Sequence, residues 1–95
     1  MVERRTVVFS GRVQGVGFRM TTVQLAEGLQ VAGTVRNIHG GPDDGGVELV
    51  VEGEIADIDA LLGRIREHFG THIRSMQQQG SRATGLPRPG ISVIH

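Results

Sequence analysis

The stretch 58–69 repeats its apolar residues with the period of an α-helix, and this pattern limits the possible folds more than any other feature of the chain. The apolar positions follow at i, i+3, i+4, i+7 and i+11 and are Ile58, Leu61, Leu62, Ile65 and Phe69. Asp57 and Gly70 suit the two ends, because an acidic side chain favours the positive end of the helix dipole and glycine commonly terminates a helix. A helix with one apolar face must cover another layer, and we expect that layer to be a sheet.

Segments on both sides of this helix predict the strands of the sheet. Val7, Phe9 and Val13 alternate with polar residues, which indicates a first strand. A helix follows from Phe18, with apolar residues at helical spacing as far as Leu29 and an end at Gly33. The remaining predicted strands are Thr34–Ile38, Val47–Glu52, Ile73–Gln79 and Ile91–Ile94, with turn residues at His39–Gly46 and a loop at Gly80–Gly90.

The order β-α-β-β-α-β with an extra short C-terminal strand predicts an α+β fold. It is the order of a ferredoxin-like split β-α-β sandwich, in which two helices cover one face of an antiparallel sheet. A chain of 95 residues can build one such core, but two would each be too small without disulfides or metal. We therefore expect residues 1–95 to form a single domain.

The charged residues exclude several functions. The 10 basic residues are all arginine and are balanced by 10 acidic ones, so no overall positive field would attract nucleic acid. The missing lysine excludes Schiff-base chemistry and a Walker phosphate loop, and the missing cysteine excludes thiol nucleophiles and thiolate metal sites. RNA binding on the sheet is not expected either, because Phe9 is the only aromatic residue on a candidate platform strand.

We expect no metal or organic cofactor. His68 and His72 have the spacing of a metal-binding pair, but Gly70 should end the helix between them. Asp43 and Asp44 lie among prolines and glycines, where aspartate is a typical turn former. No apolar run has the length of a membrane span or a signal-peptide core, so a cytoplasmic monomer without membrane partners is the default expectation.

The segment Gly11–Arg19, which reads GRVQGVGFR, joins the first strand to the first helix. Gly15 and Gly17 permit backbone angles at which successive N–H groups converge on one point, and such a concavity binds anions. The helix start adds positive potential, and Arg19 can offer a planar two-pronged donor to phosphoryl oxygens. The same glycines could instead serve only a tight connection, with Arg19 in solvent, and spacing alone leaves both interpretations open.

The residues at Gly11–Arg19 resemble the acylphosphatase signature, Gly-x-Val-Gln-Gly-Val-x-Phe-Arg. Gly33–Asn37 resembles a second element of that family, Gly-x-Val-x-Asn, at the expected distance from the first. The resemblance implies an enzyme that hydrolyses small acyl phosphates to a carboxylate and inorganic phosphate. It also implies that Arg19 binds the phosphoryl group and Asn37 orients the attacking water. The implied cradle consists of the main-chain amides of Gln14, Gly15, Val16, Gly17 and Phe18.

The chain departs from the family pattern after Asn37. Val47 lies four residues later than the pattern would place it, and the excess falls in His39–Gly46. An insertion in this hairpin is the simplest account, and it could alter the rim of the site near Asn37. A non-catalytic domain that keeps the cradle to sense phosphate or another ligand remains the alternative function.

Overall fold

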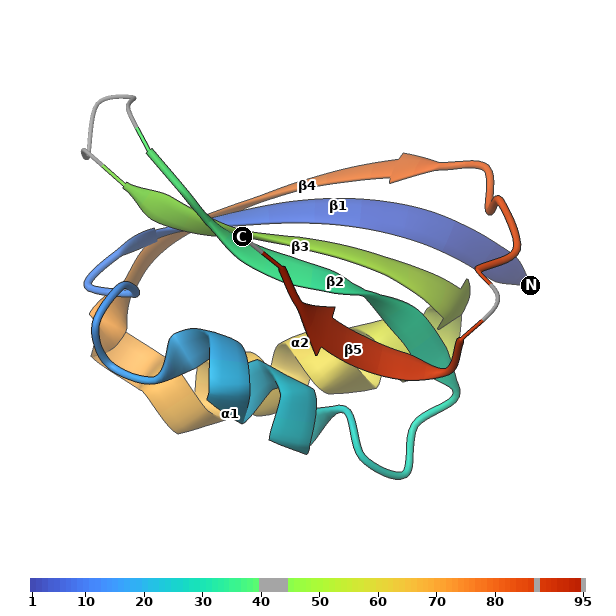
Figure 1. The fold of residues 1–95 in the computed structure, drawn as a ribbon, viewed down its shortest axis with the longest axis horizontal. Helices are drawn as coiled ribbons and strands as arrows, with labels where there is room; N and C mark the ends of the chain where they lie inside the picture. The colour runs from blue at the N-terminus through green and yellow to red at the C-terminus, as the bar shows by residue number, and fades with distance from the viewer. Residues whose placement is uncertain (40–44, 87, 95) are drawn as a thin grey trace.

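The computed structural model describes residues 1–39, 45–86 and 88–94. Within this part of the chain, five strands form one sheet in the order β4-β1-β3-β2-β5, and both α-helices cover the same face of it (Figure 1). The elements are β1 (Val2–Gly11), α1 (Phe18–Leu25), β2 (Val31–Ile38), β3 (Gly46–Glu54), α2 (Ile55–Phe69), a 3-10 turn (Gly70–His72), β4 (Ile73–Ser81) and β5 (Gly90–Val93). The predicted ferredoxin-like α+β sandwich is confirmed.

The fifth strand joins the sheet differently from the other four. Strands β4, β1, β3 and β2 pair antiparallel with their neighbours, whereas β5 pairs parallel with β2. Strands β4 and β5 lie at opposite edges of the sheet (Figure 1). The chain therefore crosses between the two edges, and β5 then runs in the same direction as β2. The C-terminal strand therefore lies beside β2 and against α1.

The core lies between the sheet and the two helices. All five apolar residues of the stripe on α2 are buried, which confirms the prediction made from their spacing. They meet inward-facing residues of the central strands, because side chains of period two share one face of a sheet. The buried apolar side chains of the three central strands are Val7 and Phe9 of β1, Val31 and Val35 of β2, and Val47, Leu49 and Val51 of β3.

Helix α1 is shorter than the sequence analysis expected. It ends at Leu25 rather than near Gly33, and β2 begins already at Val31. Gly28 adopts a φ of 83°, a left-handed conformation that stops the helix, and the guanidinium of Arg64 donates to the carbonyl oxygen of Leu25 at 2.8 Å. Burial of Val31 against the core then favours the strand over another helical turn.

Glu52 holds the loop between β4 and β5 in place. Its carboxylate accepts hydrogen bonds from the hydroxyl of Thr84 at 2.6 Å, the guanidinium of Arg4 at 2.6 Å, and the backbone N–H groups of Thr84 and Gly85 at 2.8 and 2.9 Å. Burial by itself would raise the pKa of Glu52, but these donors together lower it to about 2. The ionised carboxylate of Glu52 therefore binds the loop residues Thr84 and Gly85 to β3.

Candidate functional site

A pocket of about 230 Å³ opens where the loop after β1, the start of α1, β2 and β5 meet. Its lining comes from both motifs singled out in the sequence and from the last strand. The lining residues are Val13, Gly15, Gly17, Phe18, Arg19, Met20, Asn37 and Val93. The fold therefore brings Arg19 and Asn37, which lie on different elements, to one cavity.

The loop between β1 and α1 contains two glycines in the left-handed region. Gly15 has a φ of 77° and Gly17 a φ of 75°, and a side chain at either position would be strained even though a Cβ there would meet no other atom. Gly17 is also the N-cap of α1, and none of the described side chains caps this end of the helix. Free N–H groups at a helix start carry positive potential, so the end of α1 at the pocket is suited to an anion.

The aromatic ring of Phe18 fixes the start of α1. It is buried and stacks on Phe69 with 4.3 Å between ring centroids, and it packs against Phe9 at 5.0 Å. The hydroxyl of Thr22 donates to the carbonyl oxygen of Phe18 at 2.8 Å and is buried beneath this turn. The next residue, Arg19, consequently emerges from a rigid part of the core.

The side chain of Arg19 is available to a ligand. It is half-buried, and it forms no hydrogen bond or ion pair with any residue that the structure describes. Several other arginines are engaged: Arg4 with Glu52, Arg5 with Glu3 and Asp59, Arg36 with Glu48, and Arg64 with main-chain carbonyls. A guanidinium at the edge of a pocket that is not engaged by the described residues favours a bound oxyanion.

Asn37 lies near the end of β2, on the side of the sheet that faces the helices. It is two residues after the buried Val35 and pairs with the buried Val47, and both relationships place its side chain on the inner face. Its carboxamide makes no hydrogen bond to the part of the chain described here. The carboxamide of Asn37, a neutral group that can both donate and accept hydrogen bonds, thus faces the pocket that the start of α1 also lines.

Gln14 has a role that sequence reasoning missed. We expected only its main-chain amide to contribute, but its side-chain Nε2 donates to the carbonyl oxygens of Ile38 and Gly46, each at 2.9 Å. The side chain therefore ties the loop to the paired ends of β2 and β3, next to Asn37. Gly45 leaves room for it, because a Cβ at that position would come within 2.9 Å of Nε2.

The predicted site residues differ in their placement. Gly15, Gly17, Phe18, Arg19 and Asn37 line the pocket, whereas Val16 is 42% exposed and is not part of the lining. Three apolar residues of the lining, Val13, Met20 and Val93, were not among the predicted site residues. Met20 adjoins the motif and could have been included, but nothing in the sequence indicates the parallel pairing that brings Val93 to the site.

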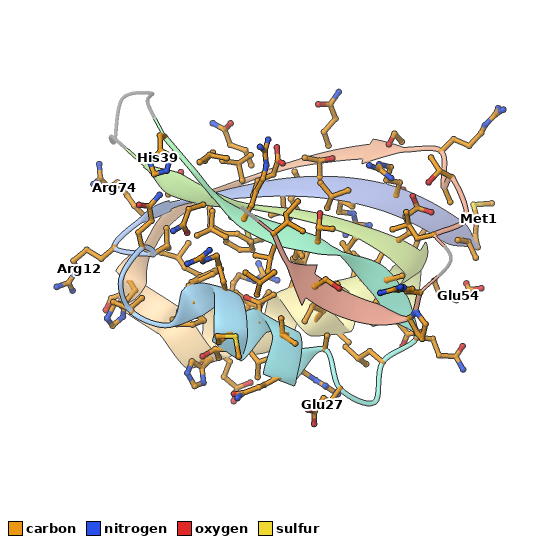
Figure 2. All side chains as sticks on the ribbon, in the orientation of Figure 1. Met1, Arg12, Glu27, His39, Glu54 and Arg74 are labelled. Atoms are coloured by element: carbon orange, nitrogen blue, oxygen red, sulfur yellow. The ribbon has the colours of Figure 1, made fainter. Side chains whose placement is uncertain are left out.

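Two arginines and a histidine lie at the end of the molecule that holds this loop. Arg12, His39 and Arg74 lie at that end, opposite Met1 and Glu54 (Figure 2). The ring of His68 stands edge-on to the ring of Phe69, and the described residues contain no group of three or more His, Cys, Asp or Glu that could hold a metal ion. The turn that carries Asp43 and Asp44 lies outside the described residues.

Two left-handed glycines, a helix start and the guanidinium of Arg19, neither of which is bonded by a described side chain, define a ferredoxin-like domain with a pocket suited to an oxyanion. The acylphosphatase family model matches residues 5–85. The chain belongs to the acylphosphatase family. Neither α1 nor α2 is long and apolar enough to cross a membrane.

Individual relatives support this membership in sequence and in structure. An acylphosphatase of Paenarthrobacter aurescens (strain TC1) is 41% identical over 83 residues, which cover 86% of this chain and 84% of the relative. The crystal structure of an acylphosphatase from Bacillus subtilis matches with a TM-score of 0.81, 27% identity and complete coverage of both chains. An acylphosphatase structure from Coxiella burnetii gives a TM-score of 0.80 at 29% identity, over 98% of this chain and 93% of that one.

Proposed function

We propose that this protein hydrolyses the carboxylic–phosphoric anhydride bond of small acyl phosphates, releasing a carboxylate and inorganic phosphate. The single observation that carries the proposal is the shared pocket of Arg19 and Asn37, at the two left-handed glycines of the β1–α1 loop. Membership of the acylphosphatase family supports the same reaction.

In the proposed mechanism, Arg19 and the main-chain N–H groups of Gln14–Phe18 bind the phosphoryl oxygens. Charge on these oxygens is spread in the transition state of phosphoryl transfer, where fixed donors stabilise it. The tie between Gln14 and the ends of β2 and β3 keeps the loop rigid, so that the donors need not reorganise during the reaction.

Asn37 is proposed to orient the attacking water. Its carboxamide can hold the water by one hydrogen bond, in line with the bond to the leaving group. The water oxygen bonds to phosphorus, the bond from phosphorus to the acyl oxygen breaks, and the electron pair leaves with the carboxylate. A phosphoryl oxygen of the substrate accepts the proton of the water.

The small number of polar groups in the pocket fits this chemistry. A carboxylate is a stable leaving group, so its departure requires no proton donor from the protein. Arg19 and Asn37 are the polar side chains among the described lining residues, and neither acts as an acid or base near neutral pH. Positioning and charge stabilisation are therefore the contributions that this pocket can make.

A turnover assay on purified, chelator-treated protein tests the proposal. Acetyl phosphate is the substrate, release of inorganic phosphate is measured, and added phosphate is expected to inhibit competitively. Binding of phosphate without any turnover would overturn the proposed hydrolysis and support the ligand-sensing alternative. An essential base with a pKa near neutrality in the pH–rate profile would contradict proton transfer to the substrate.

A further inference from the structure

The pocket has an apolar part that phosphate binding does not use. Val13, Met20 and Val93 line it together with Arg19 and Asn37. Met20 is 60% exposed, so its apolar surface is accessible to a ligand in the pocket. Apolar side chains that line a cavity beside a few polar groups are typical of a ligand-binding site.

The backbone explains why Val93 faces this cavity. In the parallel pairing of β5 with β2, Val93 lies opposite Val35, whose side chain points into the core. Residues paired in register lie on the same face of a sheet, so Val93 also lies on the helix side. Asn37 follows Val35 by two residues in β2 and lies on that side as well. The N–H group of Ile94 donates to the carbonyl oxygen of Val35 at 3.0 Å and fixes this register.

The size of the pocket leaves room for more than a phosphoryl group. A phosphoryl group with its oxygens fills roughly the volume of two or three water molecules, on the order of 60–90 Å³. The cavity measures about 230 Å³. The remaining space adjoins side chains without charge, because Arg19 is the only charged residue in the described lining.

We propose that Met20 and Val93 form a subsite for the acyl group, and that the enzyme prefers acyl phosphates with uncharged alkyl chains of several carbons. This inference rests on the proposed hydrolysis and adds the substrate class to it. Burial of each additional methylene against these side chains favours the bound state and the transition state alike. Each methylene that the subsite buries therefore multiplies kcat/KM by a similar factor, until the chain extends beyond the cavity.

A homologous series of substrates measures this contribution. We would assay acetyl, propanoyl, butanoyl and hexanoyl phosphate, whose leaving carboxylates have nearly equal basicity, so that differences report on binding of the chain. We expect kcat/KM of the wild-type enzyme to rise about two- to threefold per methylene between acetyl and butanoyl phosphate. Succinyl phosphate, which carries a terminal carboxylate on a four-carbon chain, should react more slowly than butanoyl phosphate.

Two polar substitutions of similar shape test the assigned residues. Met20→Gln and Val93→Thr should each reduce the dependence on chain length to about 1.5-fold or less per methylene. The inhibition constant of inorganic phosphate, which has no acyl group, should change much less. Val2→Thr is the matched control, because Val2 is a 56% exposed strand residue that does not line this pocket. Circular dichroism spectra and melting temperatures verify that each variant is folded.

The outcomes separate this inference from the proposed function. Turnover of every substrate with equal kcat/KM would leave the hydrolysis intact and overturn the apolar subsite. Faster turnover of succinyl phosphate than of butanoyl phosphate would also overturn it, in favour of a cation such as Arg12 at this end of the molecule (Figure 2). No turnover of any member of the series would overturn the proposed hydrolysis and, with it, the inference.

Discussion

The ring of Phe18 stacks on the ring of Phe69 with 4.3 Å between centroids and an angle of 25° between planes. One ring starts α1 and the other ends α2, so this contact joins the two helices directly below the candidate site. Arg19 follows Phe18 in the chain. The position of the guanidinium thus depends on the C-terminal end of a helix that does not itself line the pocket.

This contact predicts a large effect of Phe69→Ala. The substitution removes a buried ring and leaves a cavity beneath Phe18, so we expect a loss of about 3–5 kcal/mol in the free energy of unfolding. Urea denaturation measures it, and Phe69→Leu, which keeps most of the volume, should cost much less. Equal stability of the Phe69→Ala variant and the wild type would contradict the anchoring role.

Substitution of Arg19 by glutamine should separate activity from stability. We expect kcat/KM for acetyl phosphate to fall about 10²- to 10³-fold and the inhibition constant of phosphate to rise at least about tenfold, because a charged two-pronged donor is lost. The melting temperature should stay within about 2 °C, since Arg19 makes no bond to the described residues. Arg66→Gln, on the exposed face of α2, is the control.

Substitution of Asn37 should act on kcat more than on substrate binding. In Asn37→Ala the water would lose its positioning group, so we expect kcat to fall about 10²-fold or more while the inhibition constant of phosphate changes little. Steady-state kinetics with phosphate as inhibitor distinguish the two effects. A variant with normal kcat would remove Asn37 from the proposed mechanism.

Gln14 offers a test of loop rigidity. Gln14→Glu has nearly the same shape but places a carboxylate against the carbonyl oxygens of Ile38 and Gly46, which then lose their donor. We expect a cost of about 1–3 kcal/mol in the free energy of unfolding and a fall in kcat/KM of at least about tenfold. Gln77→Glu, on an exposed position of β4, controls for the added charge.

The pKa of Glu52 predicts how stability depends on pH. It is about 2 in the folded protein, below the value of about 4.3 of an unperturbed glutamate, so the folded state binds this proton more weakly. The stabilisation by ionised Glu52 is complete above about pH 5 and is lost as pH falls through about 2. Glu52→Gln should cost about 1–2 kcal/mol at pH 7, and less at pH 3.

Denaturant titrations of the wild type and Glu52→Gln between pH 2.5 and pH 7 measure this difference. The gap in unfolding free energy between the two proteins should narrow as the pH is lowered. A gap that stays constant over this range would mean that the hydrogen bonds to Thr84 and Gly85 do not depend on the charge of the carboxylate.

Local patterns in the sequence predicted most of the architecture. The stripe on α2 has the strict helical spacing that burial requires, and the alternation in β1 and β3 matches a sheet with one buried face. The end of α1 could not be predicted in the same way. Leu29 and Val31 continue an apolar pattern, and the left-handed Gly28 together with the contact from Arg64 decides where the helix stops.

The candidate site was predictable where its residues share a short segment. Gly15, Gly17 and Arg19 lie in the loop before α1 and its first turn, so their spacing in the sequence, together with the resemblance to the acylphosphatase signature, is enough to predict an anion-binding loop. The tie from Gln14 to the β2–β3 ends and the approach of Val93 depend on how distant strands pair, which one sequence does not state. The roles of Arg19 and Asn37, the monomeric state and the cytoplasmic location remain predictions.

Strand β5 is short, lies at an edge and is hydrogen-bonded only to β2 among the described strands. Its release would open one wall of the pocket and expose Ile91, which is buried in the core. Such an opened form would keep Arg19 and Asn37 but lose Val93. The preference of the enzyme for longer acyl chains would then report on fraying of β5. On mild warming, this preference should weaken before the hydrolysis of acetyl phosphate does.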